Sequence, residues 1–169
     1  ELDVPIKIIQ KALANFPGIS RRFEIIGNLK INEKEFLWID DYGHHPTEMK
    51  EVLETITNVW GKRRLIMIFQ PHRYSRTAEH FNQFIDILKK VDNLILMEIY
   101  AANEKPINNI SSEAIVLEIK KYNNNVLLIN NNEDLTKSLN NIIEDNDILL
   151  TMGAGNISQF VNHYKKIVQ

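Results

Sequence analysis

The chain has 169 residues with a formal net charge of −2, and 44% of its residues are hydrophobic, which excludes a disordered tail. The near-neutral balance of 20 basic and 22 acidic residues argues against a nucleic-acid-binding protein, which usually presents a basic face. Disulfides and thiolate metal sites are excluded because there is no cysteine, and no apolar run approaches the roughly 18 residues of a membrane helix.

Apolar residues at helical spacing predict a helix over residues 4–15, which ends before a Phe-Pro-Gly turn. Two strands are predicted next, over 23–31 and 35–40. From there a strand and the helix that follows it repeat five times. The repeated strands are expected at 36–41, 64–70, 93–100, 125–129 and 147–152, and the helices at 46–60, 77–90, 111–121, 133–144 and 157–168.

The repeated strands are continuous apolar runs, which is typical of strands that are buried on both faces of a sheet. The predicted fold is therefore α/β: a Rossmann-like, doubly wound, mostly parallel sheet with helices on both faces, preceded by a short helix and a strand pair. Ligands of such folds gather at the carboxyl ends of the strands. A site is therefore expected in the loops that follow the strands, at 41–46, 70–77, 100–110, 130–133 and 152–157.

The loop after the first repeated strand has the sequence DDYGHHP over residues 40–46, with His44 next to His45. Its acids and histidines at a helix start predict a polar site for an anionic or hydroxylated ligand, and Asp41 could accept hydrogen bonds from a ribose. The alternative is structural, with Asp40 and Asp41 capping the helix and the histidines as surface turn residues. A zinc site is disfavoured because adjacent histidines rarely converge on one metal and no third ligand is apparent.

The loop after the second repeated strand has the sequence QPHRYSRT over residues 70–77. Its arginines, Arg73 and Arg76, each offer a planar fork that matches a carboxylate or a phosphate. No acidic residue lies within the loop, so the arginines and His72 predict an anionic ligand. The alternative is ordinary solvated charge, with Thr77 as the N-cap of the next helix.

The loop after the fifth repeated strand has the sequence TMGAGNI over residues 151–157. Gly153 and Gly155 would let the backbone approach a ligand closely, but a tight turn with close helix–strand packing explains them equally well. The third glycine of a G-x-G-x-x-G motif is missing because Ser158 stands there. The loop at 101–110 is unusually long and carries no assigned chemistry.

Taken together, these motifs resemble the C-terminal domain of the Mur ligase family, in the branch that joins L-alanine to UDP-N-acetylmuramate. The resemblance covers nearly the whole chain in the right order. It rests on GISRRF at 18–23, DDYGHHPTE at 40–48, QPHRYSRT at 70–77, YAA at 100–102 and TMGAGNI at 151–157. The related murein tripeptide ligase shares the His-His-Pro feature and remains an alternative.

The resemblance implies an ATP-dependent amide-forming reaction of peptidoglycan precursor synthesis in the cytoplasm. The sugar carboxylate is phosphorylated, and the amine of L-alanine then attacks the acyl phosphate. Residues 1–22 would be the tail end of a central ATP-binding domain and a hinge, and residues 23–169 would be the C-terminal Rossmann-like domain. The hinge itself is expected over residues 16–23.

The resemblance also implies roles for individual residues. Arg22 and Asp41 would face ATP. The pocket for L-alanine and the reacting carboxylate would be lined by Tyr42, His44, His72, Arg73 and Arg76. Among these, His72 and Arg76 would be catalytic, because a histidine near the amine could take its proton and a guanidinium could stabilise developing negative charge. No residue is expected to bind a metal.

One departure from the family is large: the chain has neither a G-x-x-x-x-G-K-[ST] phosphate loop nor the magnesium ligands of the central domain. ATP and Mg would be bound mainly by N-terminal and central domains that act in cis, and the chain alone is expected to be inactive. It also lacks an initiator methionine, which favours a fragment. The alternatives are a stand-alone or inactive Rossmann-like nucleotide-binding module, and an interaction domain whose histidine loop is only structural.

Overall fold

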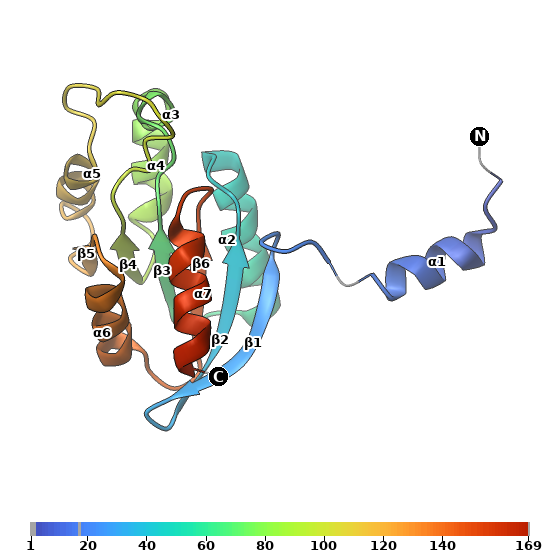
Figure 1. The fold of residues 1–169 in the computed structure, drawn as a ribbon. Coiled ribbons are helices and arrows are strands. Elements are labelled where there is room, and N and C mark those ends of the chain that lie inside the picture. Colours follow the sequence, from blue (N-terminus) through green and yellow to red (C-terminus); the bar gives the residue numbers. More distant parts are fainter. Residues whose placement is uncertain (1–2, 17, 169) are drawn as a thin grey trace.

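The computed structural model describes residues 3–16 and 18–168. Within this part of the chain, six strands form one sheet in the order β1-β2-β6-β3-β4-β5 (Figure 1). The strands are β1 (Glu24–Ile31), β2 (Lys34–Asp41), β3 (Leu65–Phe69), β4 (Asn93–Leu96), β5 (Val126–Leu128) and β6 (Asp147–Met152). The helices are α1 (Ile6–Ala14), α2 (Pro46–Trp60), α3 (Tyr74–Glu79), α4 (Phe81–Leu88), α5 (Ser112–Ile119), α6 (Asn132–Ile142) and α7 (Ile157–Val168).

The register of the sheet brings three strand ends together. β1 and β2 form an antiparallel hairpin, and all other neighbouring strands are parallel. The last strand, β6, lies between β2 and β3, so Met152 pairs with Asp41 on one side and with Phe69 on the other. The loops that leave β2, β3 and β6 therefore start side by side at one edge of the sheet.

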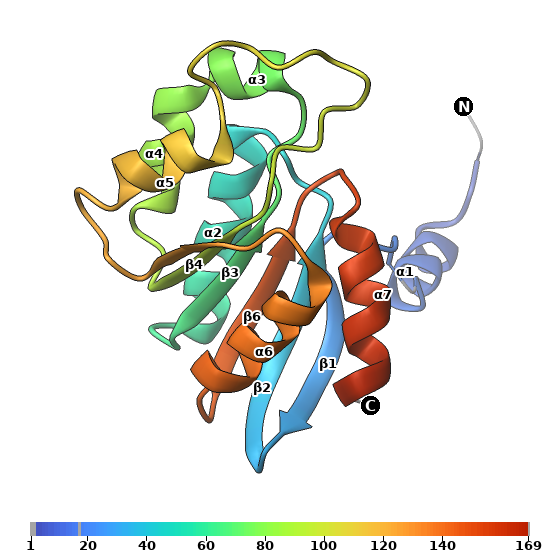
Figure 2. The same cartoon turned by 60° about the vertical axis from the view of Figure 1, so that its left-hand side comes forward.

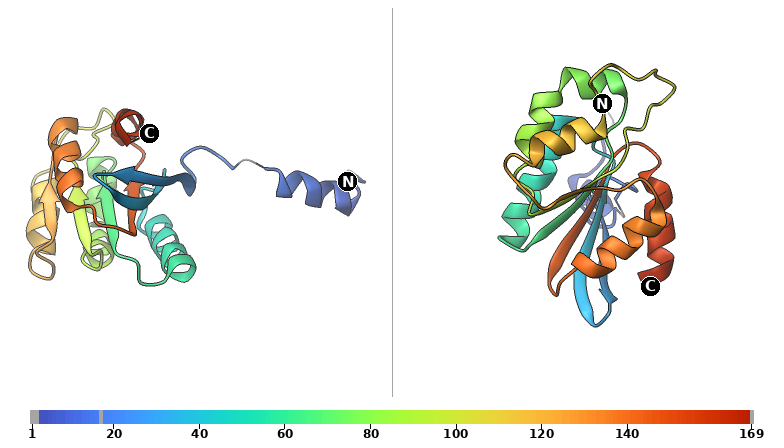
Figure 3. Two further views of the ribbon diagram at one scale, coloured as in Figure 1. Left: turned by 90° about the horizontal axis from the view of Figure 1, so that it is seen from below. Right: turned by 90° about the vertical axis from the view of Figure 1, so that its left-hand side faces the viewer.

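Helices cover both faces of the sheet, as Figures 2 and 3 show. Helices α2, α4 and α5 pack on one face, where they meet every second residue of the central strands, such as Met67 and Leu150. Helices α6 and α7 pack on the other face against the intervening residues, such as Ile66 and Leu149. Both faces are apolar because both are buried. The prediction of a doubly wound, mostly parallel α/β sheet is confirmed.

Two predicted elements are wrong in extent. The helix expected at 77–90 begins earlier and is interrupted, because His80 leaves helical geometry (φ −111°, ψ 18°) and separates α3 from α4. Thr77 lies inside α3, where its hydroxyl donates to the carbonyl of Arg73, and it is not an N-cap. The strand expected at 93–100 ends at Leu96, and Tyr100 forms only an isolated parallel bridge with His72 beyond the end of the sheet.

Helix α1 stands apart from the sheet and its covering helices (Figures 1 and 3). Its predicted amphipathic pattern is present, but none of its residues is buried. Ile6 and Leu13 are 65% and 69% exposed, and Ile8 is 58% exposed. Within the chain, α1 therefore gains almost nothing from hydrophobic burial. The expected Phe-Pro-Gly turn after it includes Pro17, which lies outside the described residues.

Candidate functional site

The start of α2 is held by a capping box that includes residues of the loop at 40–46, which we call the histidine loop. His45 is the N-cap, and its ring accepts a hydrogen bond from the backbone of Thr47 at 3.4 Å. The Oε2 atom of Glu48 accepts from the backbone N–H groups of His44 and His45 at 2.9 and 3.0 Å. The expectation that Asp40 and Asp41 cap this helix is wrong, because His45 and Glu48 satisfy its free N–H groups instead.

Glu48→Gln is expected to lower the free energy of unfolding by about 0.5–1 kcal/mol at neutral pH. Burial favours the neutral acid, but the hydrogen bonds from His44 and His45 and the charges of their rings outweigh it, so the pKa of Glu48 lies below its ordinary value of 4.5. A carboxylate with a depressed folded-state pKa stabilises the fold above its unfolded pKa, and this contribution is lost as the pH falls through the folded pKa. The difference between Glu48→Gln and the parent should therefore shrink as the pH falls below 4.5.

Urea unfolding of both proteins at neutral pH and at about pH 3.5 checks this expectation. Glu51→Gln is a matched control, because Glu51 is an exposed glutamate on the same helix. A stability difference for Glu48→Gln that stayed constant across this pH range would show that the carboxylate does not hold the helix start.

Four rings form a row across the loops that follow β2, β3 and β4. His44 contacts Tyr42 on one side and His72 on the other, and His72 stacks on Tyr100 at an interplanar angle of 17°. Each of the three pairs has its ring centroids 5.4 Å apart. We call these four rings the aromatic row. Three residues that the sequence predicted from two separate motifs, Tyr42, His44 and His72, therefore lie together.

Arg76 fixes the orientation of His72. One terminal nitrogen of Arg76 lies 3.1 Å from Nδ1 of His72 and also donates to the carbonyl of His72 at 3.2 Å. A guanidinium has no acceptor, so Nδ1 of His72 must accept, and the proton of the neutral ring lies on Nε2. Burial lowers the pKa of His72 below its ordinary 6.5, and the nearby charges of His44, Arg76 and Arg73 lower it further. This lowering of the pKa favours the neutral ring at pH 7.

Arg73 stands at the turn between β3 and α3. It has a positive φ of 72°, is exposed, and its backbone N–H donates to the carbonyl of Tyr100. An acid from elsewhere in the chain approaches this turn. Glu104, from the long loop, accepts hydrogen bonds from the hydroxyl and the backbone N–H of Ser75, and these bonds, with a smaller contribution from the charge of Arg73, lower the pKa of Glu104.

The linker before β1 is tied to the sheet by Arg21. Its guanidinium donates to Oδ2 of Asp40 at 2.9 Å and to the carbonyl of Gly153 at 2.6 Å. Asp40 is 1% exposed, and its other oxygen accepts from the hydroxyl of Thr151 at 2.6 Å, which in turn accepts from the indole of Trp38. Sequence reasoning did not single out Arg21 over its neighbour, because nothing local to RR distinguishes the two.

Arg22 and Asp41, which the sequence predicts to face ATP, differ in exposure. Arg22 is exposed, and its guanidinium carbon is 5.9 Å from the ring centroid of Tyr42. Asp41 is nearly buried, and its two oxygens accept from the backbone N–H groups of Phe23 and Gly43 at 2.7 and 2.6 Å. Asp41 therefore joins the linker to the histidine loop, and its carboxylate keeps further lone pairs for a hydroxyl.

The glycines of the last loop are explained by packing. A Cβ atom on Gly153 would lie 2.7 Å from the carbonyl oxygen of Gln70, and one on Gly155 would collide with the side chains of Gln70 and Tyr100. Gln70 itself is buried and bridges the side chain of Asn156 and the backbone N–H of Ile157. Of the two interpretations of this loop, the structure supports the tight turn with close packing.

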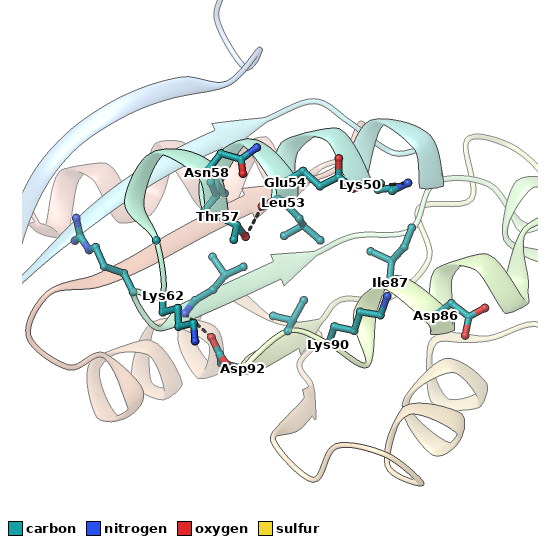
Figure 4. A pocket seen from close by; sticks show the side chains of 15 residues that line it. Lys50, Leu53, Glu54, Thr57, Asn58, Lys62, Asp86, Ile87, Lys90 and Asp92 are labelled. Carbon is teal, nitrogen blue, oxygen red and sulfur yellow. Dashed lines mark hydrogen bonds and ion pairs between the residues drawn. The ribbon is translucent and has the colours of Figure 1, made fainter.

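A separate groove of about 600 Å³ lies between α2 and α4 (Figure 4). Leu53 and Ile87 contribute apolar walls, and Lys62 and Lys90 stand at its rim. None of the residues predicted for the site lines this groove. The described residues also contain no helix long and apolar enough to cross a membrane, and no group of three His, Asp or Glu side chains placed to hold a metal ion.

Comparison with known proteins places this arrangement in a family. Residues 21–155 match the model of the Mur ligase, glutamate ligase domain. The chain is 48% identical over 158 residues to a UDP-N-acetylmuramate–L-alanine ligase from Vesicomyosocius okutanii, covering 93% of this chain and 34% of that protein. The chain belongs to the Mur ligase family, as a member of its C-terminal domain, and spans about a third of the length of this relative.

Solved structures show the same fold. A UDP-N-acetylmuramate–alanine ligase from Thermotoga maritima superposes with a TM-score of 0.73 at 26% identity, over 98% of this chain and 35% of that one. A murein peptide ligase from Psychrobacter arcticus superposes with a TM-score of 0.68 at 20% identity, over 98% of this chain and 33% of that one. The resemblance seen in the sequence is thereby confirmed at the level of the family.

Proposed function

We propose that the chain is the C-terminal domain of an ATP-dependent ligase that joins L-alanine to UDP-N-acetylmuramate in peptidoglycan precursor synthesis in the cytoplasm. The observation that carries the proposal is the contact of Arg76 with His72 inside the aromatic row, at the carboxyl edge of the sheet. The identity to a relative of that name supports the choice of substrates.

In the proposed reaction, ATP phosphorylates the sugar carboxylate, which gives an acyl phosphate and ADP. The amine of L-alanine attacks the carbonyl carbon, and phosphate leaves as the amide forms. Arg73 and Arg76 would bind the carboxylate of alanine and the developing negative charge, because a guanidinium matches a carboxylate with two parallel hydrogen bonds. Tyr42 and His44 would line the small pocket beside them.

His72 needs a specific change to act as a base. In the arrangement described above, Nδ1 accepts from Arg76, so Nε2 carries the proton and can donate a hydrogen bond to an anion. His72 can accept a proton from the alanine amine at Nδ1 once this atom is released by Arg76, or at Nε2 if the ring proton moves to the released Nδ1. A catalytic role for His72 and Arg76 therefore works as one unit, in which substrate binding to Arg76 frees His72.

Arg22 and Asp41 would meet ATP, with the exposed guanidinium toward phosphate and the carboxylate toward the ribose. Mg would be held mainly by the N-terminal and central domains in cis. Residues 1–22 would belong to the central domain and the hinge, and residues 23–169 to the C-terminal domain. Because Arg21 is bonded to Asp40 and Gly153, we propose that the hinge bends before Arg21.

The test is ADP release by the full-length ligase with UDP-N-acetylmuramate and a panel of amino acids and peptides. Release is expected to require both the sugar nucleotide and L-alanine, and the 169-residue chain alone should release none, since it has no phosphate-loop motif. Release that depends on a murein tripeptide instead of L-alanine would support the tripeptide ligase. Absence of release with every acceptor would leave the nucleotide-binding module as the better description.

A further inference from the structure

The long loop at 101–110 turns back sharply to reach α3. Ala102 and Asn103 both have positive φ values, 48° and 68°, and the N–H of Glu104 donates to the carbonyl of Ala101 at 2.9 Å. A left-handed backbone at two consecutive residues that are not glycine is unfavourable for each of them, so other contacts must hold the turn. The turn brings the side chain of Glu104 to Ser75.

Glu104 accepts hydrogen bonds from the first turn of α3, which has no side-chain cap of its own. Helix α3 has six residues, its N-cap Arg73 makes no side-chain cap, and no acid lies in its first turn. So short a helix is unstable alone, and its first N–H groups need partners. Glu104, which is 29 residues further along the chain, accepts from the N–H of Ser75 at 2.9 Å and from its hydroxyl at 2.7 Å.

Tyr100, which directly precedes this loop, contacts the turn before α3 at three points. The backbone N–H of Tyr100 donates to the carbonyl of Pro71, its carbonyl accepts from Arg73, and its ring stacks on His72. Helix α3 carries Arg76, whose guanidinium holds His72. A shift of the first turn of α3 would therefore move Arg76 and release His72.

We infer that Glu104 is a positioning residue for the amino-acid acceptor: it caps α3 from outside and so aims Arg76, and with it His72, at the carboxylate of the incoming amino acid. This inference rests on the proposed function. Glu104 need not touch the substrate. Its effect should appear in the affinity for the amino acid, because Glu104 aligns the guanidinium of Arg76, which binds the carboxylate of the amino acid.

The experiment uses the full-length ligase with Glu104→Ala, Glu104→Gln and Ser75→Ala, and measures kcat and KM for L-alanine together with thermal stability. Glu104→Ala should raise KM for L-alanine about tenfold and change kcat by less than about threefold, because a charge-assisted hydrogen bond in a partly exposed place is lost. Glu104→Gln should be intermediate, since its amide oxygen still accepts from the N–H of Ser75. The double variant with Ser75→Ala should be no worse than Glu104→Ala alone.

Glu118→Gln is the matched control, because Glu118 is also a partly exposed glutamate paired with a nearby side chain, the ammonium of Lys121. It should leave both kinetic constants unchanged. An unchanged KM in Glu104→Ala would overturn the inference. A fall in kcat and in Tm that accompanies the rise in KM of Glu104→Ala, with no recovery in Glu104→Gln, would also overturn it, because these changes would indicate a purely structural role.

A readout that does not need turnover separates this inference from the proposed function. The charged groups that face His72 are His44, Arg73, Arg76 and Glu104, and of these only Glu104 raises its pKa. In the 169-residue chain, whose own helices cover both faces of the sheet, NMR titration of His72 should give a lower midpoint in Glu104→Ala than in the parent. An unchanged midpoint would show that Glu104 does not act on the environment of His72, and it would contradict the inference. Lack of alanine-dependent ADP release by the parent ligase would contradict the proposed function instead.

Discussion

Arg76→Lys in the full-length ligase is expected to lower kcat/KM for L-alanine by about 10²-fold, since lysine keeps the charge but loses the planar fork. In the parent, one nitrogen of Arg76 already contacts both Nδ1 and the carbonyl of His72. The remaining donors of the guanidinium are left for the substrate. A lysine ammonium can contact His72 in the unliganded protein, but it cannot release His72 while binding the substrate carboxylate with two parallel hydrogen bonds.

Steady-state kinetics with varied L-alanine measure this effect, and thermal unfolding shows whether the fold is intact. Arg63→Lys is a matched control, because Arg63 donates to the carbonyls of Asn146 and Asp147 at the start of β6, at the opposite end of the sheet from the aromatic row. It should change kcat/KM by less than about twofold. Similar kinetics for Arg76→Lys and the parent would mean that Arg76 takes no part in binding or catalysis.

Arg21→Ala is expected to lower the free energy of unfolding of the chain by about 2–4 kcal/mol, because it leaves the carboxylate of Asp40 buried without its charged partner. For a domain of this size, such a loss corresponds to a fall in Tm of roughly 5–15 °C. The effect is large because Asp40 is 1% exposed and cannot regain water.

Two further variants make the expectation for Arg21 specific. Arg22→Ala should change Tm little, since Arg22 is exposed, and it should instead weaken ATP use by the full-length ligase. Asp40→Asn combined with Arg21→Ala should recover part of the lost stability, because it removes the unpaired charge. Calorimetry of the parent, the two single variants and the double variant measures these Tm values. Equal Tm values for Arg21→Ala and Arg22→Ala would mean that the contact with Asp40 contributes nothing to stability.

The local sequence was sufficient for elements with strong boundary signals. Helix α2 begins at Pro46 and ends before Gly61, and the predicted bounds of this helix, of β6 and of α7 agree with the structure. The interrupted helix was missed because Phe81, Phe84 and Leu88 continue an apolar pattern that suggests one helix across His80. Periodicity reports which face is apolar, and it does not report a change of direction between two turns.

The candidate site was found only in outline from the sequence. Loops that follow neighbouring parallel strands lie at the same edge of a sheet, so the loops at 40–46 and 70–77 were expected to lie close together. In the structure they meet through the rings of His44 and His72. The partners within the site could not be predicted. Nothing near Ser75 in the sequence points to Glu104, and nothing in the linker favours Arg21 over Arg22 as the partner of Asp40.

By itself, the sequence determined the alternation of strands and helices, the two-sided burial of the sheet and the loops in which polar chemistry gathers, because apolar periodicity, proline and glycine act over a few residues. Tertiary structure decided which charges meet. The insertion of β6 between β2 and β3 sets the neighbours of Asp41 and Met152, and the return of the long loop sets the cap of α3. Such contacts depend on strand order and register, which place distant segments side by side independently of their spacing along the chain.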